Sequence, residues 1–276
     1  MAVVRGICVC AGPVSSGVEM KTLPVNWCSV NEMPYASGDL LAPIDASGRW
    51  LPNTPFVPID LAHRRGMLHR GVWLHVLSSE DELLLTKRSQ RMKTCPGTLS
   101  IIGEHHSGRE NDDDTAKRAL HEELPGLARR DNVVHSMLPL RPTPRWFLYD
   151  YPLGAGDAVR RLDRCLVSEY VVRLLTNTSQ SLALIHAAHE QEQEHESSEF
   201  YFLNLRTLWH QLNREPGSFC APALLPSALL DTLSDLSRIH GIRGAALINR
   251  SSRRAGRVPA PALPEAYDVT RVVREE

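Results

Sequence analysis

The chain has 276 residues, with 31 basic and 32 acidic side chains, and 42% of its residues are hydrophobic. A formal net charge of −1 argues against a large electrostatic footprint for nucleic acid or for anionic membranes. No window approaches the roughly 18 consecutive apolar residues of a membrane span. The cysteines are scattered, which predicts reduced thiols in a cytoplasmic protein.

Three regions are expected along the chain. Residues 1–34 show no clear period and are interpreted as an N-terminal extension of unknown role. Residues 35–248 form the expected folded domain, and the Arg- and Pro-rich residues 249–276 are expected to be a disordered tail.

Hydrophobic patterning within the domain predicts strands on both sides of one marked helix, with more helix at the end. A short hairpin is expected around a turn at 46–48, followed by a polar connector at 61–70. The expected strands are 71–78, 82–89, 98–102, 145–153, 165–175 and 200–205, and the expected helices are 112–124, 205–213 and 222–240. This arrangement favours a mixed α/β sandwich.

The segment from Gly103 to Gly126 contains the candidate metal-binding carboxylates. On the expected helix, Arg118 and Glu122 are four residues apart and share a face, with Glu123 beside them and Glu110 in the preceding loop. Mg²⁺ prefers carboxylate and phosphate oxygens, so this unit predicts a metal site for a diphosphate substrate. The alternative is a solvated helix with ordinary Glu–Arg pairs.

Glu110, Arg118, Leu120, Glu122 and Glu123 resemble the Nudix superfamily signature, G-x5-E-x7-R-E-U-x-E-E-x-G-U, in which U is a bulky aliphatic residue. The resemblance implies an α/β/α sandwich with a mixed sheet and a metal-dependent diphosphate hydrolase. It implies Glu122, Glu123 and Glu110 as ligands of Mg²⁺ or Mn²⁺. It also implies catalytic roles for Glu122, Glu123 and Arg118.

This sequence departs from the signature at three places. Glu104 stands where the first Gly is expected, Ala119 replaces the first Glu after the Arg, and Pro125 replaces the late Gly. We take Glu104 as a possible replacement ligand or base. A carboxylate of the acidic run at 190–199 is the other candidate for the base, as in Nudix relatives.

Residues 61–100 are similar to the Nudix subgroup related to isopentenyl-diphosphate isomerase. That resemblance implies an alternative metal site formed by His63, His69, His106 and Glu169, whose imidazoles would suit Zn²⁺ or Mn²⁺. His105 and His121 are expected in a loop and on the helix surface. The isomerase needs an acid–base Cys at the position that aligns with Glu104.

The leading hypothesis is a Nudix-type hydrolase that cleaves a small-molecule diphosphate by metal-dependent attack of water. An isopentenyl-diphosphate isomerase-like enzyme and a catalytically inactive Nudix binding module remain the alternatives. The sequence indicates neither a nucleic-acid nor a membrane partner, and it leaves the oligomeric state open.

Overall fold

The computed structural model describes residues 40–92, 94–151, 161–190, 197–220, 224 and 226–242. The expected extension at 1–34 and the expected tail at 249–276 lie outside these described residues.

A mixed sheet forms the centre of the described fold. Its main path runs β10–β4–β3–β9–β7, while β5 pairs with β4, β6 with β3, and β8 with β9. Strands β3 and β9 are parallel, and the other pairs in this sheet are antiparallel. The strands are β3 (Leu68–Leu77), β4 (Glu82–Arg88), β5 (Leu99–Ser100), β6 (Ile102–His105), β7 (Val134–Pro139), β8 (Arg145–Tyr151), β9 (Arg161–Leu174) and β10 (Ser197–Asn204).

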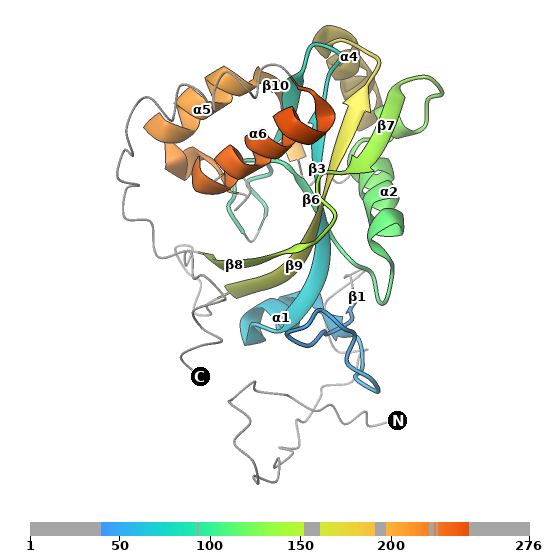
Figure 1. Ribbon diagram of the computed structural model, residues 1–276, viewed down its shortest axis with the longest axis vertical. Helices are drawn as coiled ribbons and strands as arrows, with labels where there is room; N and C mark the ends of the chain where they lie inside the picture. The colour runs from blue at the N-terminus through green and yellow to red at the C-terminus, as the bar shows by residue number, and fades with distance from the viewer. Residues whose placement is uncertain are drawn as a thin grey trace, which may run out of the picture.

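Helices cover both faces of this sheet (Figure 1). The helices are α1 (Ile59–Arg65), α2 (Asp112–Glu123), α3 (Pro125–Ala128), α4 (Thr178–His189), α5 (Leu205–Arg214) and α6 (Pro226–His240). Helices α5 and α6 lie on one side of the sheet and α2 on the other (Figure 1). The expected α/β/α sandwich with a mixed sheet is therefore confirmed.

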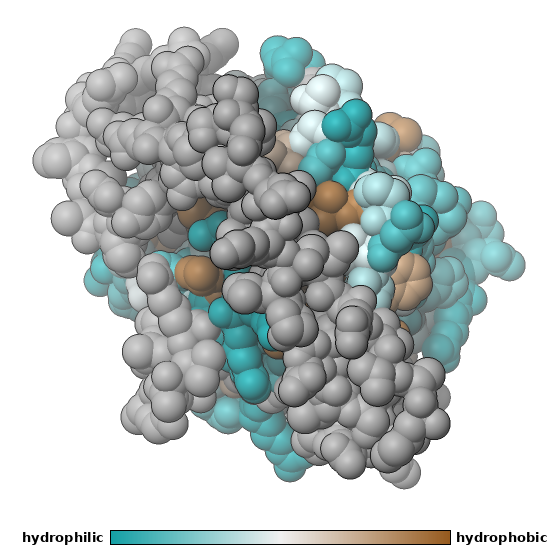
Figure 2. Space-filling view, turned by 90° about the horizontal axis from the view of Figure 1, so that it is seen from below, coloured by the Kyte–Doolittle hydropathy of each residue, from teal (hydrophilic) through white to brown (hydrophobic). Residues whose placement is uncertain are grey.

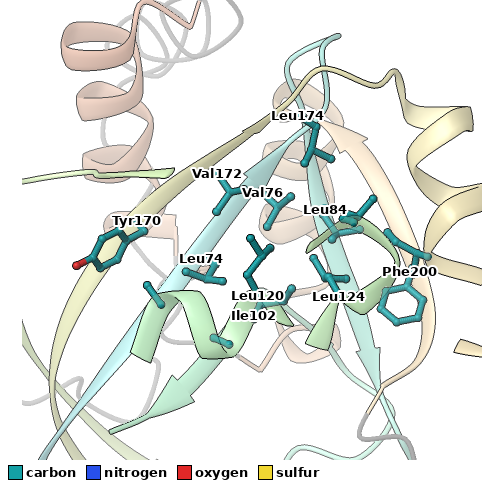
Figure 3. Packing of buried hydrophobic residues seen from close by; sticks show 14 of the residues in the cluster. Leu74, Val76, Leu84, Ile102, Leu120, Leu124, Tyr170, Val172, Leu174 and Phe200 are labelled. Carbon is teal, nitrogen blue, oxygen red and sulfur yellow. The ribbon is translucent and has the colours of Figure 1, made fainter. Parts of the chain in front are cut away.

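Alternate residues of the same strands build two separate cores. Leu74 and Val76 of β3 pack with α2, α3 and α4, and Leu120 and Leu124 close over them (Figure 3). Leu77, the next residue of β3, belongs to the core under α5 and α6. Successive side chains of a strand point to opposite faces, so one buried strand supplies both layers.

Helix α2 begins where the sequence predicts. The Asn111 side chain accepts a hydrogen bond from the Asp114 N–H at 2.9 Å, and three aspartates occupy the first turn, where the helix dipole favours negative charge. Leu120 is buried on the face that meets the sheet. The helix ends before Pro125, which begins the short helix α3.

The prediction of a polar connector at 61–70 is wrong, because α1 occupies Ile59–Arg65 and β3 begins at Leu68. Gly66 ends α1 with φ of 58°, a left-handed conformation that suits glycine. The expected hairpin is present as an Ile44–Trp50 bridge around the turn, beside the two-stranded pair of β1 (Leu40–Leu41) and β2 (Val57–Pro58).

The expectation of reduced cysteines is wrong for one pair. Cys95 and Cys220 form a disulfide, with their Cα atoms 5.6 Å apart, within the range of native disulfides. Among the described cysteines, Cys165 is a buried thiol outside that bond.

The surface seen from the α1 end is mainly hydrophilic where described residues are visible, with separate apolar side chains (Figure 2). Four large apolar residues of the described part are exposed: Leu40, Phe56, Leu138 and Leu175. Within the described part of the chain, no helix combines the length and apolar character that a membrane span requires.

Candidate functional site

Arg118 of α2 braces the loop that precedes the helix. Its Nη2 and Nε donate to Glu110 Oε2 at 3.0 and 3.2 Å, and Nη2 also donates to the His105 carbonyl at 2.6 Å. Glu110 accepts further bonds from Thr115 Oγ1 at 2.9 Å and from the Ser107 N–H at 3.2 Å. Glu110 and Arg118 therefore fix the loop, as their spacing suggests.

The same guanidinium gathers two more carboxylates. Arg118 Nη1 donates to Glu122 Oε2 at 2.9 Å and lies 3.5 Å from Glu104 Oε1. Burial raises the pKa of Glu110, but its hydrogen bonds with Arg118 and Thr115 outweigh burial and hold that pKa below its ordinary value. The structure thus brings the carboxylates of Glu104, Glu110 and Glu122 together around the guanidinium of Arg118.

The remaining positions of the signature have different surroundings. Glu123 is half-buried at the last residue of α2. Ala119 is fully buried in the core between α2 and the sheet, where an added carboxylate would be desolvated. Within the acidic run, Glu190 follows α4, and Glu199 of β10 forms an ion pair with Lys87 of β4. The other acidic residues of the run, Glu192, Glu194 and Glu196, lie outside the described residues.

A second cluster lies on the opposite face of β6. One ligand atom from each of His63, His69, His105 and Asp163 lies within 4.8 Å of the others. Asp163 Oδ1 is 3.2 Å from His69 Nε2 and 4.0 Å from His63 Nε2. The ring centroids of His63 and His69 are 5.3 Å apart, and those of His69 and His105 are 5.0 Å apart.

Strand pairing explains why these residues meet. β6 and β9 pair with β3, with His105 opposite Gly71 and Cys165 opposite His69. Asp163 precedes Cys165 by two residues and so shares its face of the sheet. His63 arrives from α1, which the Gly66 turn connects to β3.

Two anchors orient the ligand atoms. His69 Nδ1 lies 2.9 Å from the Met67 carbonyl, an acceptor that places the imidazole proton on Nδ1 and leaves Nε2 as a ligand. Tyr151 donates a hydrogen bond to Asp163 Oδ2 at 3.1 Å, leaving Oδ1 toward the imidazoles.

Among the described residues, His63 Nε2, His69 Nε2 and Asp163 Oδ1 are buried without a hydrogen bond of good geometry, although His69 Nε2 and Asp163 Oδ1 lie 3.2 Å apart. Buried polar atoms are normally satisfied, so this convergence requires an explanation. A divalent cation supplies one, since three imidazoles and a carboxylate match the donor set of Zn²⁺ or Mn²⁺. The residues fit a metal.

The protonation states also suit a cation. Burial lowers the pKa of His63 to about 4 and, with the neighbouring imidazoles, lowers that of His105 well below its ordinary value. Burial raises the pKa of Asp163, but the close imidazole of His69 outweighs it, so that pKa lies below its ordinary range. Near neutral pH, the imidazoles of His63 and His105 are therefore neutral, and Asp163 is a carboxylate.

Of the predicted set of His63, His69, His106 and Glu169, the structure brings His63 and His69 together and places the other two elsewhere. His106 Nε2 lies 3.1 Å from Asp112 Oδ1, because His106 follows His105 and faces the opposite side. Asp163, six residues before Glu169 on the same strand, takes the place expected for that carboxylate.

Glu169 belongs to a different buried network. It accepts hydrogen bonds from Arg145 Nε at 3.0 Å and from Arg141, and its Oε2 lies 3.1 Å from His75 Nε2. Burial raises the pKa of Glu169, but His75 and the two arginines together lower it to about 2. This carboxylate is already compensated by protein cations.

Of the comparisons with known proteins, only the one with solved structures gives matches. No protein-family model and no curated protein matches this sequence. The structure is similar to DR0079 from Deinococcus radiodurans, with 16% identity, 68% of this chain and 96% of that chain covered, and a TM-score of 0.44. It is also similar to a MutT protein from Methanosarcina mazei, with 13% identity, 62% and 96% coverage, and a TM-score of 0.39.

A Nudix hydrolase from Nitrosomonas europaea is similar at 13% identity, with 63% of this chain and 89% of that chain covered, and a TM-score of 0.34. Likeness at these values assigns no activity. The function must therefore be inferred from the chemistry of the site.

Proposed function

We propose that the chain is a Nudix-type hydrolase of organic diphosphates that depends on a divalent metal. His63, His69, His105 and Asp163 would hold the metal, as Mn²⁺ or Zn²⁺. The observation that supports this most directly is the convergence of their ligand atoms within 4.8 Å. That cluster borders β6, the strand that leads into the Glu110–Arg118 brace.

The chain's own residues have distinct tasks in this proposal. A bound divalent metal would neutralise phosphate charge and make water a better nucleophile. Arg118 and Glu110 keep the loop in place, and Glu104, on the face of β6 opposite the histidine cluster, is the predicted base for water on a metal held at the helix side. Glu122 and Glu123 remain the predicted ligands of a Mg²⁺ or Mn²⁺ ion on the helix side.

The direct test is a panel of nucleoside, sugar, dinucleotide and prenyl diphosphates with Mg²⁺, Mn²⁺ or Zn²⁺, scored for released phosphate or pyrophosphate. Hydrolysis of at least one diphosphate that depends on added metal is expected. Metal binding without hydrolysis of any member would instead favour an inactive binding module, especially if a nucleotide raises the melting temperature.

The ligand assignment has its own test. His69→Gln should weaken Mn²⁺ binding by more than about 100-fold, since even partners of metal ligands contribute about 10–100-fold. His121→Gln, an exposed histidine of α2, is the matched control and should bind like the wild type. Unchanged Mn²⁺ affinity in His69→Gln would remove the cluster from the proposal.

The helix carboxylates require a separate pair of variants. Glu123→Gln should reduce turnover by orders of magnitude if it holds metal, because metal charge stabilises the transition state. Glu215→Gln, at an exposed residue that follows α5, is the matched control. Full activity of Glu123→Gln would leave the histidine cluster as the sole proposed metal site.

One observation favours an isomerase-like reaction as the second candidate. Cys165 is a buried thiol on the face of β9 that carries Asp163, in register with His69. Allylic isomerisation needs a proton donor at one end of the three-carbon allylic unit and a proton acceptor at the other end. Rearrangement of a prenyl diphosphate without phosphate release, lost in Cys165→Ala, would select this candidate.

A further inference from the structure

His105 lies where the two halves of the candidate site meet. Its imidazole belongs to the histidine cluster, whereas the side chain of the preceding residue, Glu104, points to the opposite face of β6, toward α2. Arg118 of α2 contacts both residues. The backbone of β6 is therefore a physical link between the helix and the histidine cluster.

Strand pairing leaves both backbone groups of His105 on the outer edge of β6. The His106 N–H donates to the Arg70 carbonyl at 3.1 Å. Its neighbour His105, opposite Gly71, therefore occupies a non-hydrogen-bonded position of the antiparallel ladder, where the N–H and C=O point away from the partner strand. Among the described residues, β3 is the only strand that pairs with β6, so these two groups need partners from outside the sheet.

Two side chains supply those partners. The His105 N–H donates to Glu104 Oε1 at 2.9 Å, and the His105 carbonyl accepts a hydrogen bond from Arg118 Nη2 at 2.6 Å. Arg118 Nη1 lies 3.5 Å from the same oxygen of Glu104, which closes a ring around the backbone of His105. We call Glu104 and Arg118 the backbone clamp of His105.

The imidazole of His105 depends on this backbone for its position. His69 and Asp163 are each oriented by a hydrogen bond at another atom of the same side chain. Among the described residues, the imidazole of His105 has no such hydrogen bond. Its ring lies against His63 and His69, with centroids 5.3 and 5.0 Å away, and both of these are other proposed ligands. The backbone clamp is therefore what fixes His105 from outside the cluster.

We propose that Arg118 and Glu104 are positioning residues for the metal, because they hold the His105 backbone and so place its imidazole among the other ligand atoms. A carboxylate at position 104, where the signature has Gly, accepts the His105 N–H, and glycine has no side chain to do so. The metal-binding role of His105 rests on the proposed function, whereas the clamp does not. This task of Glu104 is separate from its predicted task as a base, so metal binding is measured rather than turnover.

The α2 end of the clamp is tested by Zn²⁺ titration of the full chain, with the visible absorption of bound Co²⁺ as a report on the ligand set. Arg118→Met should weaken Zn²⁺ binding by about 10–100-fold, as loss of a residue that orients a metal ligand typically does, and should alter the Co²⁺ absorption. Arg118→Lys keeps one donor for the carbonyl and should bind Zn²⁺ more tightly than Arg118→Met.

Arg173→Met is the matched control for these variants. Arg173 pairs with Asp81 at 2.9 Å and lies ten residues beyond Asp163 on β9, so its loss removes an arginine ion pair far from the cluster. This variant should bind Zn²⁺ and Co²⁺ like the wild type.

The Glu104 end of the clamp has a readout that needs no metal. Glu104→Met removes the acceptor of the His105 N–H, whereas Glu104→Gln keeps a carbonyl oxygen there. In the metal-free protein, NMR should show the His105 amide exchanging its hydrogen about tenfold faster in Glu104→Met than in the wild type. Glu104→Met should weaken Zn²⁺ binding as Arg118→Met does, and Glu104→Gln should weaken it by less than about fivefold.

Three results would overturn the clamp. Arg118→Met and Glu104→Met could bind Zn²⁺ as tightly as the wild type, the His105 amide could exchange equally in Glu104→Met and wild type, or Glu104→Gln could lose as much Zn²⁺ affinity as Glu104→Met. Should Arg118→Met fail to fold, the Glu104 variants decide alone. If the wild type binds no Zn²⁺, the proposed function fails at the cluster, and amide exchange still decides whether His105 is clamped.

Discussion

Two of the four proposed metal ligands, His69 and Asp163, are each oriented by a hydrogen bond at another atom of the same side chain. Tyr151 holds Asp163 Oδ2 and so sets the direction of Oδ1. Tyr151→Phe should therefore weaken Mn²⁺ binding by about 10–100-fold in a calorimetric titration. Tyr149→Phe, two residues earlier on β8, is the matched control, and equal affinities in the two variants would contradict the role of Tyr151.

Burial of His63 predicts a pH dependence of stability. Its pKa is about 4 in the folded state and 6.5 as the ordinary value, so the unfolded chain binds more protons between these pH values. The free energy of unfolding of the metal-free protein should therefore fall as the pH drops from 6.5 to about 4, by up to about 3 kcal/mol. Urea unfolding in a chelator at several pH values measures this fall.

His63→Gln provides the control for that pH series, because it removes the buried imidazole. The variant should lose less stability than the wild type over the same window, while His121→Gln should follow the wild type. Identical slopes for wild type and His63→Gln would show that His63 is not the group responsible.

Glu169 offers a test that separates structure from metal binding. Glu169→Gln leaves Arg141 and Arg145 without their buried carboxylate, which should lower the free energy of unfolding by about 3–5 kcal/mol. Mn²⁺ affinity should not change, because Glu169 lies outside the cluster. Loss of Mn²⁺ affinity in folded Glu169→Gln would instead restore this residue as a ligand.

At the scale of elements, the contact between α3 and α4 depends on one glycine. A Cβ added to Gly126 would lie 2.1 Å from the Leu184 carbonyl oxygen, so α4 would have to move. Gly126→Ala should destabilise the fold by about 1–3 kcal/mol in equilibrium unfolding. Gly217→Ala, where an added Cβ meets nothing within 4 Å, is the control, and equal stabilities would contradict this packing.

Periodicity in the sequence was sufficient for the main elements but not for the short or atypical ones. The expected helix at 112–124 agrees with α2, whose apolar residues recur at helical spacing. The expected strand at 82–89 agrees with β4, whose short apolar run is typical of a strand buried on both faces. Helix α1 was missed because His63 and Arg64 make its segment look like a polar connector. An apolar period in the sequence reveals a helix only when the helix buries an apolar face. The buried residues of α1 are Asp60, Ala62 and His63, so its sequence shows no such period.

The candidate site was predictable only in part for a related reason. The Glu110–Arg118 pair could be predicted because both residues belong to one loop–helix segment, in which the spacing along the chain determines which side chains meet. The choice of His105 over His106 depends on which face of β6 each residue occupies, and one residue reverses that face. Asp163 was missed because its partners come from other strands, and no local pattern marks it.

For the whole molecule, the disulfide is the largest covalent restraint among the described residues. Cys95 and Cys220 are 125 residues apart, so reduction should lower the free energy of unfolding by up to about 5 kcal/mol through chain entropy. Guanidinium unfolding with and without a reductant measures this loss. A Cys95→Ser, Cys220→Ser variant should be insensitive to reductant, and an unchanged wild type would mean that no such bond forms.

The parallel pairing of β3 with β9 has a consequence for how the protein is made. β9 follows β3 only after β4 to β8 and two helices have been synthesised. Long-range strand pairing of this kind must overcome a large entropic barrier, so the docking of β9 is expected to be a late event on the folding pathway. Because Asp163 arrives with β9, a nascent chain would expose the three histidines before their acidic companion, and the proposed cation could bind only after β9 has docked.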